Sequence, residues 1–284
     1  MSTPQRPFRP SPLAVGRKPS SNWRWAATGA LVGGLLSVFM NMPAQWLASA
    51  LWHLSKGQIQ VQEAEGSVWL GSGKLVLTGG AGSRDAMALP GRLQWQVQGL
   101  YSFNSLPSIQ MNIKAACCMK QAMPMQLSRN TQLAAWRLQV GAHVSQWPAQ
   151  LLSGLGAPWN TLQPEGRLIL QTQPLVLDFQ QGITGLQGSA TLTAEDVSSK
   201  LSTLKPMGSY LLSLVSESAA QGGPALSLVT QSGSLLLSGQ GQWHGAQFQF
   251  RGEATAVPEH AEALSNLLNI IGRREGARSL LSLG

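Results

Sequence analysis

The residue types that most often carry catalysis or bind metals are few in this sequence and scattered along it. None of the four histidines lies within metal-ligand spacing of another histidine or of a cysteine. They are His53, His143, His244 and His260. Among the 12 acidic residues, Glu195 and Asp196 are adjacent and follow a predicted strand, where a helix N-cap is the simplest interpretation. We therefore expect no catalytic residues, no metal and no cofactor, and a protein that is not an enzyme.

Glycine motifs and basic residues give no sign of nucleotide or nucleic-acid chemistry either. The nucleophile motif Gly-x-Ser-x-Gly does not occur, and Gly71-Ser72-Gly73 lies between strands instead of opening a helix. The net charge is +8, but five basic residues and no acid fall within residues 1–24. Because a nucleic-acid surface needs clustered lysines and arginines, we expect no nucleic-acid partner.

The chain has two cysteines, Cys117 and Cys118, which are neighbours and cannot join distant segments. One interpretation, which we favour, places them on a strand with one side chain in the core and the other in solvent. The other is a disulfide between the two neighbours in an oxidising compartment. Both remain open at the level of the sequence.

The longest apolar stretch is the uncharged run of 28 residues from Trp25 to Trp52. A bilayer core of about 30 Å needs roughly 20 apolar residues, and a helix from Trp25 to Trp46 would be about 33 Å long. Tryptophans at both ends and positive charges before the run favour a single-pass helix with a cytoplasmic N-terminus. We therefore predict attachment to a bacterial inner membrane, with the main domain in the periplasm. The predicted anchor residues are Trp25, Leu31, Leu35, Leu36, Phe39 and Trp46.

A cleaved signal peptide is the alternative interpretation of this stretch, because Ala48-Ser49-Ala50 resembles a cleavage site. The apolar run ends near Met40 and Pro43, which leaves about ten residues before that site, a long interval for a signal peptide. The anchor is therefore the favoured interpretation.

After Lys56 the sequence changes to short runs in which apolar and polar residues alternate. Leu93, Trp95 and Val97 alternate with glutamines, as do Phe248 and Phe250 near the end of the body. A period of two is typical of half-buried strands, and about a dozen such runs with Gly-rich turns indicate antiparallel pairing. The predicted fold class is mainly β, with an N-terminal transmembrane helix, a large curved or twisted antiparallel sheet domain and two short helices.

Two segments break the alternation and predict the short helices. Trp147–Leu155 carries Pro148 at a first helical position, and Pro258–Ile271 places its leucines on one face before Gly272, a natural C-cap. The predicted order is a disordered basic cytoplasmic tail (1–22), a transmembrane helix with a juxtamembrane segment (23–54), a periplasmic β domain (55–274) and a loose tail (275–284). Recurring Gly-Ser strand starts leave open a two-unit repeat, 57–143 and 166–255.

Several short motifs occur in a fixed order. Pro43, Trp46 and Leu47 end the anchor, and Gly66-Ser67-Val68-Trp69-Leu70-Gly71 has the form Gly-Thr/Ser-apolar-Trp-x-Gly. Gly91-Arg92-Leu93-Gln94-Trp95, the segment from Leu204 to Tyr210, and Leu267-Leu268 with Gly272-Arg273 follow. In this order the motifs resemble the general secretion pathway protein N family, over about residues 25 to 282. The paired cysteines and the long N-terminal tail depart from the family pattern.

The resemblance implies an accessory inner-membrane component of the type II secretion machine, which exports folded proteins across the outer membrane. Its partners would be other inner-membrane subunits and membrane lipid, and the family has no catalytic residues to transfer. The motif residues expected to be structural are Gly66, Trp69, Gly71, Gly208, Tyr210 and Gly272. The alternative function is a membrane-rooted β groove that binds lipid or lipopolysaccharide. What separates the two is whether Trp95, Ile109, Ile113 and Phe248 line an open trough or a closed core.

Overall fold

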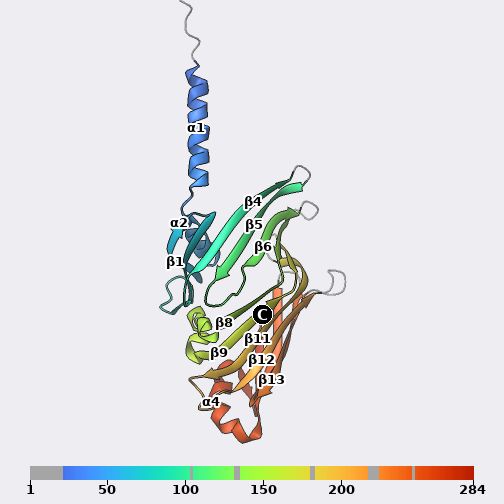
Figure 1. Cartoon of the computed structure of the whole chain (residues 1–284). Helices are drawn as coiled ribbons and strands as arrows, with labels where there is room; N and C mark the ends of the chain where they lie inside the picture. The colour runs from blue at the N-terminus through green and yellow to red at the C-terminus, as the bar shows by residue number, and fades with distance from the viewer. Residues whose placement is uncertain (1–21, 103–104, 131–134, 180–182, 217–223, 245–246) are drawn as a thin grey trace, which may run out of the picture. The chain divides into compact units, whose positions relative to one another are not determined.

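The structure, a computed structural model, describes residues 22–102, 105–130, 135–179, 183–216, 224–244 and 247–284 (Figure 1). The predicted basic tail lies outside the described residues, apart from Asn22. The chain divides into two units, residues 1–41 and 42–284. The second unit contains all the strands and is the β body.

The apolar stretch forms two helices instead of one. α1 (Trp23–Met40) belongs to the first unit and α2 (Ala44–Leu54) to the second. The prediction of one continuous anchor is wrong because Pro43 has no backbone N–H to donate and holds the residue before it out of helical conformation. Leu31, Leu35, Leu36 and Phe39 therefore lie on α1 with Trp25, whereas Trp46 lies on α2.

Every residue of α1 is exposed. Its exposed large apolar side chains include Leu31 at 64%, Leu35 at 63% and Phe39 at 45%. Among the described residues, no helix combines the length and the mean hydropathy required to cross a membrane.

α2 packs on the β body. Ala44 is 1% exposed and lies in a cluster with Val61 and Trp95, against which Leu47 and Leu51 pack. The part of the apolar stretch after Pro43 therefore covers strands of the β body.

The strands pair antiparallel throughout the described residues, which confirms the prediction of a mainly β, antiparallel fold. In chain order they are β1 (Ile59–Gly66), β2 (Leu70–Thr78), β3 (Ala86–Ala88), β4 (Leu93–Ser102), β5 (Ser105–Ala115), β6 (Met123–Asn130), β7 (Ala135–Val140), β8 (His143–Pro148), β9 (Pro164–Thr172), β10 (Leu175–Phe179), β11 (Ile183–Ser199), β12 (Gly208–Ser216), β13 (Ala225–Gly233), β14 (Leu235–His244), β15 (Gln247–Ala256), β16 (Arg273–Glu275) and β17 (Arg278–Leu283).

One long strand joins the two parts of the sheet. The beginning of β11 pairs with β10, which continues the series β1–β2–β4–β5–β6–β7–β10. The rest of β11 pairs with β9 on one side and with β12 on the other, and β12 to β15 and β17 follow. The division into repeats 57–143 and 166–255 stays a prediction.

The strand register separates side chains into two faces over β4–β7, β10 and the beginning of β11. One face, the apolar face, carries the row Ile109, Leu127, Leu138, Leu177 and Leu186, in which each residue is the cross-strand neighbour of the next. The opposite face, the amide face, carries the row Gln98, Gln110, Gln126 and Gln139. Both rows follow from the period-two alternation of the sequence, because paired residues share a face.

The two predicted short helices are present. The first is the 3-10 helix η1 (Ala149–Leu155), and the second comprises η2 (Pro258–His260) and α4 (Ala261–Ile271). The short α3 (Trp159–Leu162) was not predicted. The expectation of a loose tail at 275–284 is wrong, because β17 pairs with β15 from Arg278 to Leu283 and continues the sheet.

Candidate docking surface

The first family motif forms a tight corner between β1 and β2. Gly66 has a φ of 85°, and a Cβ there would lie 2.5 Å from the Leu70 carbonyl oxygen. At Gly71 a Cβ would lie 2.5 Å from the ring of Trp95, whose Nε1 donates to the Ser67 carbonyl at 3.2 Å. The half-buried Trp69 accepts a hydrogen bond through its carbonyl from Val97 N at 2.6 Å. Glycine is therefore required at both corner positions for the chain to pass so close to its neighbours.

A depression of about 450 Å³ opens beside this corner. Its lining includes the motif glycines together with polar side chains of the amide face, among them Glu65, Ser72, Gln94, Gln96, Asn112 and Lys114. Leu70 also lines it and is 65% exposed. A second depression, of about 210 Å³, lies further along the amide face and is lined by Gln110, Gln126 and Gln139. At this corner, the exposed side chain of Leu70 is therefore surrounded by polar side chains.

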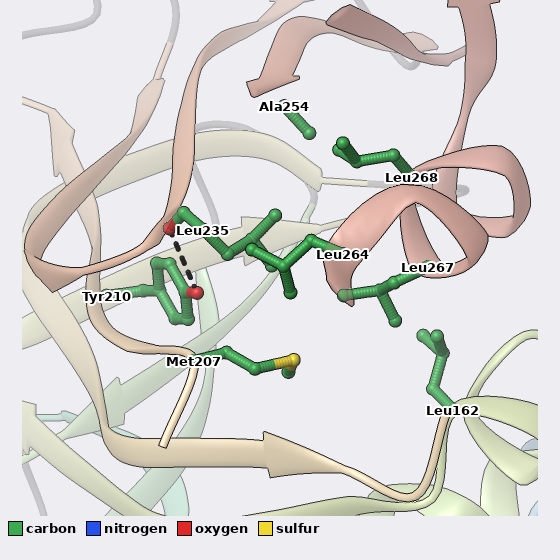
Figure 2. Packing of buried hydrophobic residues seen from close by; sticks show 8 residues of the cluster. All are labelled: Leu162, Met207, Tyr210, Leu235, Ala254, Leu264, Leu267 and Leu268. Carbon is green, nitrogen blue, oxygen red and sulfur yellow. Dashed lines mark hydrogen bonds between the residues drawn. The ribbon is translucent and has the colours of Figure 1, made fainter. Parts of the chain in front are cut away.

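The second group of motif residues lies at the other end of the β body, in the core between α4 and the sheet (Figure 2). The buried Tyr210 donates from its hydroxyl to the Leu235 carbonyl at 3.1 Å. A Cβ on Gly208 would lie 2.8 Å from that hydroxyl oxygen. Burial raises the pKa of Tyr210 above its ordinary value.

Gly272 is the C-cap residue of α4, as the sequence predicts, but its backbone is not in the left-handed conformation that favours glycine there. Its φ of −167° is extended backbone that any residue can adopt. A Cβ there would instead lie 2.4 Å from the Leu280 carbonyl oxygen. The close approach of β17 explains the glycine, and Arg273 starts β16 instead of facing the helix end.

Replacing Tyr210 by phenylalanine is expected to lower the free energy of unfolding by about 1–2 kcal/mol at pH 8, since it removes the buried donor to Leu235. The raised pKa means that the unfolded chain loses this proton first. The wild type therefore keeps this contribution below about pH 10 and loses it as the pH rises further. In urea unfolding, the difference in free energy of unfolding between the wild type and Tyr210→Phe should be smaller at pH 11 than at pH 8. An equal difference at both pH values would contradict this role of Tyr210.

Several acidic residues, among them Glu195 from the adjacent pair in the sequence, take part in surface ion pairs. Glu63 and Glu65 both pair with Arg92. Glu195 pairs with Arg167 at 3.1 Å. The N-cap interpretation of Glu195-Asp196 is wrong, because both residues lie within β11 at a register shift where Asp196 has a φ of 50°.

The histidines do not converge on one site. His53 lies on α2, and His244 is the last residue of β14. His260 Nδ1 lies 2.9 Å from the Ser234 hydroxyl. His143 is 7% exposed, and its Nε2 is the one buried side-chain polar atom without a hydrogen-bond partner in the part of the chain that the structure describes. Within those same ranges, no group of three histidine, cysteine or acidic side chains could hold a metal ion.

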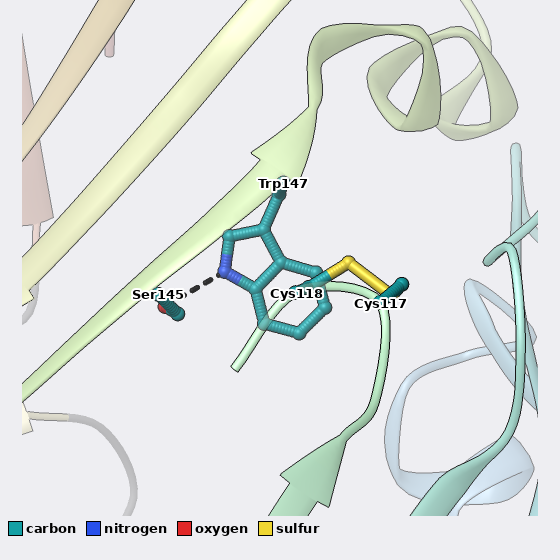
Figure 3. Close-up of a disulfide and its surroundings, with 4 residues drawn as sticks. All are labelled: Cys117, Cys118, Ser145 and Trp147. Carbon is teal, nitrogen blue, oxygen red and sulfur yellow. Dashed lines mark hydrogen bonds between the residues drawn. A yellow bond between two sulfur atoms is a disulfide. The ribbon is translucent and has the colours of Figure 1, made fainter. Parts of the chain in front are cut away.

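The two cysteines form a disulfide with each other (Figure 3). Cys118 is buried and Cys117 is exposed, so one does face the core, but they lie in the turn after β5 and not on a strand. The favoured interpretation is therefore wrong in two respects: the cysteines are joined in a disulfide, and they do not lie on a strand. In the turn, Cys118 N and Met119 N both donate to the Ala115 carbonyl, and Trp147 packs against the cluster that contains Cys118. The Cys118 carbonyl accepts from Gln146 N at 2.8 Å, which ties the turn to β8.

The comparisons with known proteins bear on the whole β body. No curated protein and no solved structure matches the chain. One family model does match, over residues 57–280, and its description is type II secretion system (T2SS), protein N. That range begins just before β1 and ends within β17, so it covers almost all of the sheet. The chain therefore belongs to the type II secretion system protein N family.

Proposed function

We propose that the chain is an accessory component of the type II secretion machinery that docks or stabilises other inner-membrane subunits. The observation that carries this proposal is the family match over residues 57–280. It spans the β body from the motif corner to the C-terminal core, so the match covers the sheet as a whole and not an isolated motif. The role would serve export of folded proteins across the outer membrane.

We assign the docking contact to the motif corner. Protein interfaces are organised around a few apolar anchors that become fully buried within a polar rim. Leu70 has this character, being 65% exposed beside the amide and charged side chains that line the larger depression. Its strand is fixed by the glycine-framed turn, so binding would require little ordering of the chain.

Replacing Leu70 by aspartate is expected to reduce recovery of inner-membrane secretion subunits roughly 30-fold, the effect of losing an anchor of about 2 kcal/mol. The measurement is a pull-down of the full chain from native membranes in mild detergent, with the recovered subunits quantified by mass spectrometry. Leu283→Asp is the matched control, because Leu283 is also an exposed leucine, at 62%, but lies on β17. Equal recovery with both variants would refute the assignment to Leu70. A wild-type pull-down without any secretion subunit would refute the docking function.

We further propose that α1 attaches the chain to the inner membrane, with the β body on the periplasmic side. The exposed apolar side chains along α1 and the single charge within it, Arg24, support this placement. A reporter enzyme that is active only in the periplasm, fused after Gly284, should be active. Activity of a cytosolic reporter at the same position would overturn the topology.

A further inference from the structure

The apolar face over β4–β7 and β10–β11 consists of two complete rows of apolar side chains. Beside the row that starts at Ile109 runs a second one, Val97, Met111, Met125, Val140 and Leu175, in which each residue again pairs with the next. Neighbouring strands lie about 4.8 Å apart, so each five-strand row extends about 19 Å.

The helices of the β body pack elsewhere. α2 packs on β1 and β2, η1 on β2, β3 and β9, and α4 on β15 to β17. Trp95, close to α2, is 4% exposed, whereas Ile109 is 44% exposed, and Met111, Met125, Leu127 and Leu138 are half-buried. At the other end of the two rows, Val140, Leu175 and Leu186 are buried and form a core cluster. The face is thus closed at both ends and accessible between them, on β5 to β7.

One charged side chain adjoins the two rows. Of the apolar-face residues of β4–β7 and β10–β15 whose side chains the structure describes, only Arg129 is charged. It is exposed, and its guanidinium carbon lies 5.7 Å from the ring centroid of Trp136, which is itself 44% exposed. A permanent positive charge held on an aromatic ring next to an apolar surface matches an amphiphile with an anionic headgroup.

We propose that this face binds the acyl chain of an anionic membrane lipid, with the headgroup at Arg129 and the chain over the accessible apolar side chains of β5 to β7. A peptide strand would leave its backbone N–H and C=O groups without partners on this surface, whose rows offer no polar side chain. An acyl chain has no such groups and gains free energy with each methylene that it buries. The single positive charge complements a phosphate or carboxylate headgroup. Binding here is independent of docking at Leu70, which lies on the opposite face of the sheet.

The test is photolabelling of the full chain in mild detergent with a palmitic acid that carries a diazirine near the end of its chain, followed by peptide mapping. We expect labels on β5, β6 and β7. Ile109→Asp should reduce this labelling about tenfold, the effect of losing contact with about two methylenes. Gln110→Asp, the next residue on the same strand and on the amide face, should leave it unchanged. Because Ile109 is already 44% exposed, the substitution is expected to leave the fold intact, which circular dichroism would verify.

The Arg129→Gln variant distinguishes recognition of the headgroup from nonspecific hydrophobic binding of the probe. It should weaken labelling by the palmitate probe but not by the matching diazirine derivative of hexadecanol, which has no charge. Labels confined to α1, or equal labelling of Ile109→Asp and Gln110→Asp, would overturn the proposal. Crosslinks between two copies of the chain at Ile109 would also overturn it, by assigning the face to self-association.

Discussion

Replacing Arg137 by methionine is expected to lower the free energy of unfolding by about 3 kcal/mol. Arg137 on β7 holds Asp178 on β10 with two hydrogen bonds, Nε to Oδ1 at 2.8 Å and Nη2 to Oδ2 at 2.9 Å. The hydrogen bond to Asp178 raises the pKa of Arg137, which therefore stays charged. The Asp178 side chain is only 9% exposed, so removing the arginine leaves a buried carboxylate without its cation. Urea unfolding followed by far-UV circular dichroism measures the loss.

Two further variants show whether burial is the cause. Lys74→Met breaks the pair between Lys74 and Glu63, whose side chains are 41% and 57% exposed, and should cost under about 1 kcal/mol. In the Arg137→Met background, Asp178→Leu should recover much of the lost stability, because it removes the buried carboxylate that has lost its arginine. If Arg137→Met costs no more than Lys74→Met, the buried pair contributes no more to the stability of the sheet than an exposed one.

Alternation of apolar and polar residues was sufficient to predict the strands, because the period of two reports directly which side chains share a face. Leu93, Trp95 and Val97 do lie in β4, and Phe248 and Phe250 in β15. Strand order was beyond such reasoning, since nothing local in β11 indicates that one half pairs with β10 and the other with β9 and β12. The prediction for the C-terminal residues was wrong for the same reason. β17 forms because it pairs with the edge of β15, which is not evident from the local sequence.

Apolarity alone also could not tell a helix facing lipid from a helix facing protein. The run from Trp25 to Trp52 is uniformly uncharged, yet Pro43 divides it, and the part after the proline buries Ala44 against Val61 and Trp95. A proline within an apolar stretch was the available signal. At the motif corner, the sequence suggested a glycine-framed turn, but the exposure of Leu70 depends on the path of β2 and β4 past each other.

The proposed docking contact and the proposed lipid site lie on opposite faces of one sheet. Both therefore depend on the stability of that sheet. A sheet that exposes part of its apolar face depends on its ends to hold the strands in register. At the first end α2 covers Trp95, and at the other α4 covers Tyr210 and Leu235 (Figure 2). The cluster at the α4 end includes residues from Leu162 in α3 to Leu268 in α4, so its loss would affect a long span of chain.

Replacing Leu264 by alanine is accordingly expected to lower the free energy of unfolding by about 3 kcal/mol. Leu264 is 0% exposed and points from α4 into the cluster formed with Leu235, Leu267 and Leu268 (Figure 2). Truncation removes the buried methyl groups and leaves a cavity that helix and sheet can only partly close. Ile270→Ala, on the same helix at a position 38% exposed, should cost under about 1 kcal/mol and controls for helix propensity. Urea unfolding of the full chain in mild detergent compares the two. Equal losses would mean that α4 contributes little to the sheet, and the stability of the α4 end would then have to come from β17 pairing with β15.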